Sequence, residues 1–127
     1  MRSAIYGVIF TAFLASAGIV QAGDLDGKSL FCTDLHNGHH PVYGLVFEQG
    51  KVTRWQVDGF SKKKPYEGKT YNEKGTIHIY WNAGAGWIYL DRRTLKVDAD
   101  QCSITTPTEI FHKLDEIIAV AKRTNKI

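Results

Sequence analysis

Hydrophobic and polar residues alternate with a period of two through the middle of the chain. Because successive side chains of a strand point to opposite faces, this alternation predicts strands with one buried face. The spacing of the runs, about 8–12 residues, is typical of an antiparallel meander. The runs occupy residues 28–34, 42–49, 51–58, 66–72, 76–82, 87–91 and 94–97. The fold class predicted is mainly β: a curled antiparallel meander or small barrel of about six to eight strands.

The first hairpin, around Gly50, indicates which side chains are buried. Tyr43, Leu45 and Phe47 share one side of their strand. Trp55 and Val57 are predicted to join them across the hairpin. The second hairpin is expected to turn at residues 73–75.

Residues 87–90 (WIYL) are apolar on both sides of their strand. A strand of this kind is usually covered on both faces. A curled sheet or barrel with a helix plugging one end or covering one face meets this requirement, and a flat one-faced sheet does not.

The end of the chain has the period of a helix. Thr106 is placed as N-cap, Pro107 at the first helical position, and Glu109 completes a capping box. The predicted helix spans about 107–123, and we expect residues 87–90 to receive its apolar stripe, because its polar face mixes both charges and does not suit a membrane surface. The stripe consists of Ile110, Phe111, Leu114, Ile117, Ile118 and Ala121.

Residues 1–22 have the features of an export signal. Arg2 precedes an apolar run over residues 4–14, and residues 20–22 (VQA) give a small-x-small cleavage pattern. The alternative, an uncleaved anchor, has an apolar stretch shorter than the roughly 20 residues that span a bilayer. Cleavage leaves about 105 residues, residues 23–127, enough for a single β-rich domain. We expect a periplasmic or secreted protein without a stable membrane anchor.

Two cysteines agree with export. Cys32 and Cys102 are expected to form a disulfide that ties the first strand to the segment between the last strand and the helix. A loop of this length stabilises by about 4 kcal/mol in the chain-entropy model. A redox thiol is the alternative, but it would need a CxxC motif or an activating neighbour.

The net charge and the absence of known catalytic motifs argue against several classes of function. The net charge of +3 gives little attraction for nucleic acid. The chain contains no nucleophile elbow, phosphate loop, zincin helix or dinucleotide fingerprint. We therefore do not expect an enzyme, and no catalytic residue or resident cofactor is assigned.

A histidine-rich segment is the first candidate for chemistry. Asp34, His36, His39 and His40 carry ligand groups that suit zinc, copper or nickel. The competing interpretation is a solvated turn, since loops collect His, Asn and Gly.

Three lysines between two aromatic residues are the second candidate. The loop expected over residues 59–65 carries Lys62, Lys63 and Lys64, which suit an anionic ligand or, more simply, solubility.

An aromatic strip is the third candidate. His78, Tyr80, Trp87 and Tyr89 share a face if the residues between them point inward. Such a strip suits a protein, a sugar or a flat ring, with Tyr80, Trp87 and Tyr89 as ligand-binding residues. It equally suits the platform for the helix, which is the interpretation we favour.

Several short motifs resemble those of small exported bacterial proteins of unknown function. They are Leu30-Phe31-Cys32, the strand from Gly44 to Phe47, the run at 87–97 (WIYLDRRTLKV) with its Asp-Arg-x-Thr turn, and Gln101-Cys102. The resemblance implies export and architecture and carries no catalytic residue. At the level of fold alone, the outline is also similar to calycin-like barrels and periplasmic lysozyme inhibitors.

These observations favour a non-catalytic binding or accessory protein. Its contact surface would be the barrel mouth or the aromatic strip, and its partner a protein or small ligand outside the cytoplasm. The alternative is a periplasmic transition-metal-binding protein that uses the histidine segment. An inhibitor of an extracellular enzyme is the third possibility.

Overall fold

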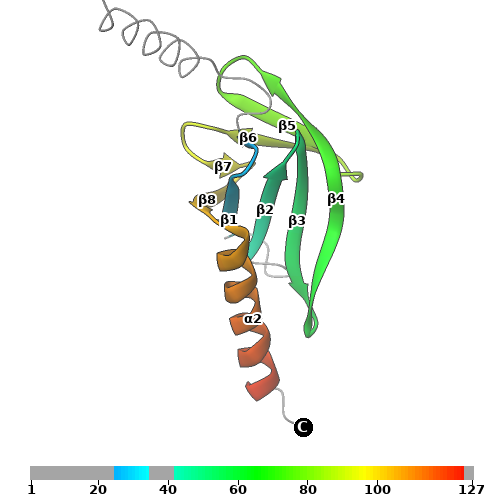
Figure 1. The fold of residues 1–127 in the computed structure, drawn as a ribbon, viewed down its shortest axis with the longest axis vertical. Helices are drawn as coiled ribbons and strands as arrows, with labels where there is room; N and C mark the ends of the chain where they lie inside the picture. The colour runs from blue at the N-terminus through cyan, green and yellow to red at the C-terminus, as the bar shows by residue number, and fades with distance from the viewer. Residues whose placement is uncertain (1–24, 35–41, 125–127) are drawn as a thin grey trace, which may run out of the picture.

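The strands close into an antiparallel barrel in the computed structural model, which describes residues 25–34 and 42–124 (Figure 1). Neighbours in sequence are neighbours in the barrel, and β1 pairs with β8 to close it. The elements are β1 (Ser29–Thr33), β2 (Val42–Glu48), β3 (Lys51–Asp58), β4 (Ser61–Lys74), β5 (His78–Asn82), β6 (Trp87–Asp91), β7 (Lys96–Val97), β8 (Asp100–Thr105) and α2 (Pro107–Thr124). The predicted fold class is confirmed.

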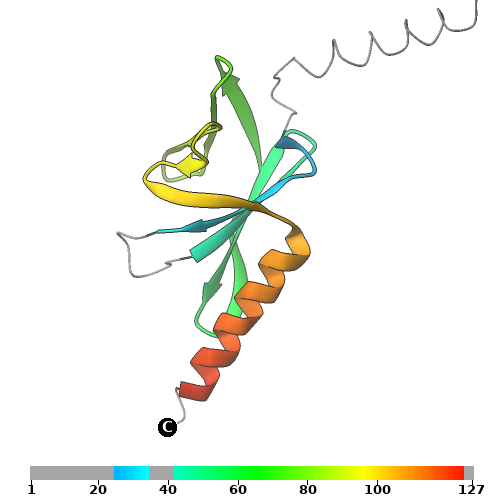
Figure 2. The ribbon, with the colours of Figure 1, turned by 90° about the vertical axis from the view of Figure 1, so that its left-hand side faces the viewer.

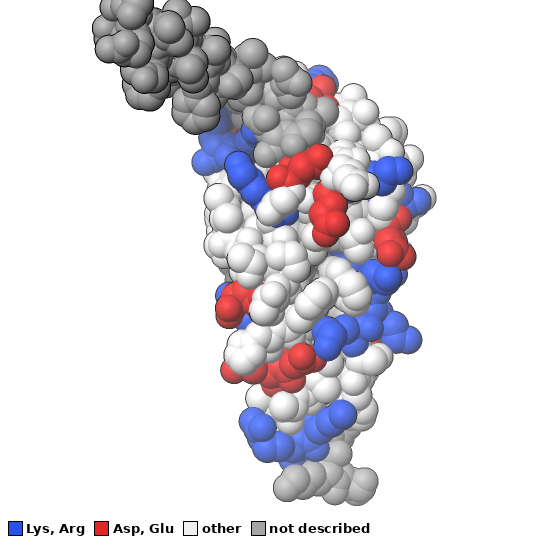
Figure 3. Space-filling view, viewed as in Figure 1, with Lys and Arg blue, Asp and Glu red and all other residues white. Residues whose placement is uncertain are grey.

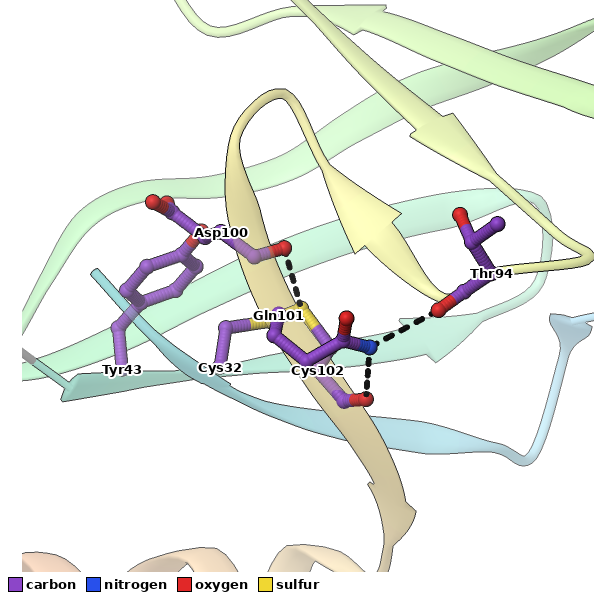
Figure 4. The surroundings of a disulfide bond; sticks show 6 residues. All are labelled: Cys32, Tyr43, Thr94, Asp100, Gln101 and Cys102. Atoms are coloured by element: carbon purple, nitrogen blue, oxygen red, sulfur yellow. Dashed lines mark hydrogen bonds between the residues drawn. A yellow bond between two sulfur atoms is a disulfide. The ribbon is translucent and has the colours of Figure 1, made fainter. Parts of the chain in front are cut away.

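The closing strand β8 was not expected. The sequence pattern predicts only a connection here. In the structure, Cys102 is the one buried residue of β8 and Ile104 is 65% exposed, which explains why the strand has no clear alternation. In the barrel, Cys102 lies directly opposite Cys32 of β1, and the two form the expected disulfide (Figure 4). The Gln101 side chain of β8 donates to the carbonyl of Thr94, which ties β8 to the turn between β6 and β7. The disulfide therefore joins two strands at the seam of the barrel.

Residues 59–65, expected to be a loop, are mostly strand. β4 begins at Ser61 and continues for 14 residues. Its first half is largely exposed, so it lacks the alternation that marks a strand. The pairing of β3 with β4 shifts register twice, and Pro65 and Gly68 lie in these irregular stretches, where a missing N–H and a positive φ are tolerated.

The register of the first hairpin decides which residues fill the barrel. Tyr43, Leu45 and Phe47 point inward as expected, and the Phe47 ring meets the rings of Tyr71 and Trp81 edge to face. Directly paired residues point to the same side of a sheet.

Trp55 and Val57 are on the opposite side from the one expected. Gly44 pairs with Trp55, and Gly44 is an outward position of β2, so Trp55 and Val57 lie on the outer face of the barrel. The two-residue turn sets this register by pairing Glu48 with Lys51, which places the inward residues of β3 at even numbers.

The helix α2 packs on the outside of β2, β3 and β4, with Ile110 and Leu114 buried against Val46 (Figure 2). Phe31, Val42, Trp55, Val57 and Phe111 surround this contact. The predicted helix and its cap are confirmed, because the Glu109 N–H donates to the Thr106 hydroxyl at 3.2 Å. The predicted receiver, residues 87–90, is wrong.

Gly44 explains where the helix docks. A Cβ built on Gly44 would lie 2.5 Å from Cγ2 of Ile110, closer than side-chain atoms approach. The absent side chain lets Ile110 seat directly on the β2 backbone. No helix in the described part of the chain is long and apolar enough to cross a membrane.

Candidate functional site

The outer face of β5 and β6 carries a row of aromatic side chains. Three directly opposed pairs point outward: His78 with Asp91, Tyr80 with Tyr89, and Asn82 with Trp87. The residues between them, including Ile79 and Leu90, point into the barrel. We call Tyr80, Trp87 and Tyr89 the aromatic face.

The aromatic face is open, and no described segment covers it. Trp87 is 52% exposed and Tyr89 is 46% exposed, while Tyr80 between them is half-buried. The prediction that this strip is the platform for the helix is therefore wrong, because α2 packs on the β2–β4 sector instead. The prediction that the three residues bind a ligand is untested.

The three rings contact one another but are not coplanar. The Tyr80 and Tyr89 ring centroids are 6.0 Å apart with an interplanar angle of 28°, and those of Tyr80 and Trp87 are 5.7 Å apart at 55°. The paired strands hold the backbone beneath the rings, and each ring packs against the next.

Two shallow grooves border the rings, and Lys74 lines both. One, of about 370 Å³, is formed by Lys74, Tyr80, Trp87 and Tyr89. The other, of about 520 Å³, is formed by Lys74, Gly75, His78 and Tyr89. The Lys74 ammonium group makes no ion pair or hydrogen bond with any described residue. Sequence reasoning missed Lys74, whose position beside the rings depends on the pairing of β4 with β5.

Asp91 forms the charged edge of this face. Its carboxylate accepts from the Arg93 side chain at 3.2 Å and from the Arg93 backbone N–H at 2.8 Å. These hydrogen bonds lower the pKa of Asp91 to about 2. His78 lies 3.9 Å from the same carboxylate. At ordinary pH the Asp91 carboxylate is therefore ionised, and the neighbouring Arg93 balances its charge.

The three lysines of the second candidate lie at the start of β4, beside the helix. Lys62 pairs with Asp115 of α2. Lys64 pairs with Glu67 at 3.0 Å, and its ammonium group lies 5.2 Å from the centre of the Trp55 ring. Lys63 is exposed on the same strand. Two of the three cations thus already have protein partners, and binding of an anion here stays a prediction.

The metal prediction falls mainly outside the described residues, because His36, His39 and His40 are not among them. Asp34 is described, and its proximity is one of the causes that raise the pKa of the Asp100 carboxyl group, after desolvation. Among the described residues, no group of three or more His, Cys, Asp or Glu side chains could hold a metal ion. Binding of zinc, copper or nickel by the histidine segment stays a prediction.

Sequence reasoning missed a polar cluster inside the barrel. Tyr43 donates from its hydroxyl to Asp100 Oδ2 at 2.5 Å, and the Arg54 guanidinium lies 3.8 Å from the centre of the Tyr43 ring. Arg54 Nε donates to Gln56 Oε1 at 2.9 Å. Arg54 and Gln56 at alternate positions of β3 are the available signal, since these positions otherwise carry apolar residues.

Burial raises the pKa values of the acidic groups in this cluster. Desolvation, followed by the hydrogen bond to Asp100, raises the pKa of the Tyr43 hydroxyl. Desolvation also raises the pKa of Asp100, against the hydrogen bond from Tyr43. In a neighbouring contact, Trp81 Nε1 donates to the Tyr66 hydroxyl at 3.0 Å. These polar groups use one another as partners, which is the arrangement of a structural network.

The surface charge is mixed. On the face shown in Figure 3, Lys and Arg side chains alternate with Asp and Glu side chains in small groups. Lys122 and Arg123 lie in the last turn of α2, where cations suit the helix dipole. Comparisons with protein-family models, curated proteins and solved structures find no match to this chain.

Proposed function

We propose that this chain is an exported, non-catalytic binding protein whose contact surface is the aromatic face. The observation that carries the proposal is the exposure of Trp87 and Tyr89 beside Tyr80 on a pair of hydrogen-bonded strands. A contiguous patch of large apolar side chains exposed to solvent marks an interaction site, whereas single exposed apolar residues are common on protein surfaces. The second outward apolar sector, on β2 and β3, is already covered by α2.

Two further features support this assignment. The polar groups of the barrel interior hydrogen-bond to one another, which favours a structural role for them over a catalytic one. The disulfide and the signal-like residues 1–22 support export, since disulfides persist in oxidising compartments.

The contact surface is tested by mapping binding on the folded protein. Panels of oligosaccharides, peptides and planar aromatic compounds are screened by ¹H–¹⁵N shift perturbation. We expect binders to shift the Trp87 indole and the amides of Tyr80 and Tyr89, and to lose affinity for a Trp87→Ala/Tyr89→Ala variant. A matched control, Phe60→Ala/Ile104→Ala, removes two large exposed hydrophobic side chains from other parts of the barrel. Equal loss in both variants would contradict the proposal.

Export is tested separately by the intact mass of the protein recovered outside the cytoplasm. A chain that begins at residue 23, two mass units lighter than its reduced form, is the expected result. A chain that retains residues 1–22 would contradict cleavage.

A further inference from the structure

Lys74 is placed differently from Lys64 and Arg54, two of the three cations that lie over aromatic rings in the described residues; the third, Lys113, lies over Phe31 beside the helix. Lys64 and Arg54 lie against Trp55 and Tyr43, and each also has a protein partner, Glu67 and Gln56. Lys74 borders Tyr80 and Tyr89 in both grooves and has no partner among the described residues. An unpaired cation beside exposed rings provides a place for a negative charge on whatever the rings hold.

Amide side chains flank the rings on the same face. Asn72 of β4 is paired with Tyr80, and Asn82 is paired with Trp87. Asn82 accepts a hydrogen bond from the Gly84 N–H through Oδ1, and its NH₂ group has no hydrogen-bond partner among the described residues. Both side chains are exposed. The rings are thus bordered by donors and acceptors of neutral hydrogen bonds as well as by the Lys74 charge.

The size of the aromatic face is too small for a stable protein interface. Three aromatic side chains that are already about half buried add at most roughly 300 Å² of apolar contact. A stable interface buries about 800 Å² on each partner. A ligand a few rings long fits this area better than a folded protein.

The tilt of the rings selects among small ligands. Trp87 is inclined by 55° to Tyr80, so one flat ring cannot lie on both faces at once. A chain of puckered rings joined by flexible linkages can follow such a surface. Sugar rings have apolar C–H faces, which are attracted to the negative face of an aromatic ring, and hydroxyl edges, which hydrogen-bond to amides.

We propose that the aromatic face binds an acidic oligosaccharide, with a sugar carboxylate at Lys74 and successive sugar rings over Tyr89, Tyr80 and Trp87. This inference rests on the proposed function and names its ligand class. The stacking supplies apolar contact, the two asparagines hold hydroxyl groups, and Lys74 distinguishes acidic from neutral sugars.

The test uses the full mature chain with its disulfide intact. Oligouronates of several linkages, and the same compounds as neutral methyl esters, are titrated by calorimetry and by the Trp87 indole signal. We expect an acidic compound to bind and its methyl ester to bind about tenfold more weakly, the effect of one charge-assisted contact. Lys74→Gln should weaken the acidic compound by the same factor and leave the ester unchanged. The matched control is Lys51→Gln, which removes the charge of an exposed lysine on β3, away from the aromatic face.

The possible results test the ligand class and the binding surface separately. Equal binding of acid and ester, with no effect of Lys74→Gln, overturns the acidic class and leaves the aromatic face as the binding surface. Absence of binding by every oligosaccharide, while peptides or planar compounds shift Tyr80 and Tyr89, overturns the sugar inference alone. Saccharide binding that a Trp87→Ala/Tyr89→Ala variant retains overturns both proposals.

Discussion

Two sectors of the barrel wall carry apolar side chains on the outside, and among the residues that the structure describes, a helix covers one of them and nothing covers the other. On β2 and β3, Val46 and Trp55 lie beneath α2. On β5 and β6, Trp87 and Tyr89 are open to solvent. Apolar character alone does not decide which sector the helix takes, since both have it.

The difference lies in shape. Gly44 leaves a gap in the β2 surface that Ile110 fills, with contacts too close to admit a Cβ. The aromatic face has large rings at the corresponding outward positions and no small residue among them. Close packing favours the sector where the helix can approach the backbone, and the sector with large rings stays open to solvent.

The largest effect is expected at the buried core of the covered sector. Leu114 is fully buried, so Leu114→Ala should lower the free energy of unfolding by about 2–5 kcal/mol. Ile117 lies on the same predicted stripe but is 37% exposed, so Ile117→Ala should cost about 1 kcal/mol or less. Urea denaturation of both variants measures the difference. Equal losses would mean that the helix packs more deeply than Ile110 and Leu114 indicate.

The shape argument is tested at Gly44. Gly44→Ala should lower the free energy of unfolding by about 1–3 kcal/mol, because the new methyl group would clash with Ile110. Adding Ile110→Ala should make the two substitutions non-additive, since the second removes the clashing atoms. A double-mutant cycle by chemical denaturation measures the coupling. Strict additivity would show that Gly44 does not determine the docking position.

On the open sector, substitution should have little effect on folding. Trp87→Ala and Tyr89→Ala should each change the free energy of unfolding by about 0.5 kcal/mol or less. Both side chains are roughly half exposed and lie outside the core. Thermal unfolding of each variant is the measurement. A large loss would mean that the rings brace the barrel, and the contrast between the two sectors would disappear.

The smallest effect concerns pH at the edge of the open sector. The pKa of Asp91 is about 2 in the folded chain, below the ordinary value of 3.8. The folded state therefore binds fewer protons in this window, and the ionised carboxylate stabilises it above pH 3.8 and ceases to do so as the pH falls toward 2. Wild type should exceed Asp91→Asn in melting temperature at pH 6, and the gap should close near pH 2. A gap independent of pH would exclude the charge as its cause.

Local patterns predicted the elements that bury one face. Alternation located β2, β3 and β5, a continuous apolar run located β6, and the capping residues located the start of α2 at Pro107. The pattern failed for β8 and the first half of β4, because few of their side chains enter the core. Alternation marks burial, so a strand held mainly by backbone hydrogen bonds escapes it.

The second limit on prediction from the sequence is how elements that are far apart in the chain pack against one another. The side on which Trp55 lies follows from a one-residue register, and the docking site of α2 follows from three-dimensional shape. Gly44 within an alternating strand was the available signal for close approach of another element. For the candidate site, the sequence identified Tyr80, Trp87 and Tyr89. Lys74 joins them only through the pairing of β4 with β5.

The seam between β1 and β8 has a consequence for how the chain folds. Its paired residues, such as Cys32 and Cys102, are 70 positions apart, whereas the other strand pairs join neighbours along the chain. In a reduced chain, the first and last strands must meet by diffusion. Their pairing closes the longest loop of any strand pair in the barrel and therefore has the largest entropic cost. Once the two sulfur atoms are joined, the first and last strands meet as neighbours, and closing the ring becomes as local a step as forming a hairpin.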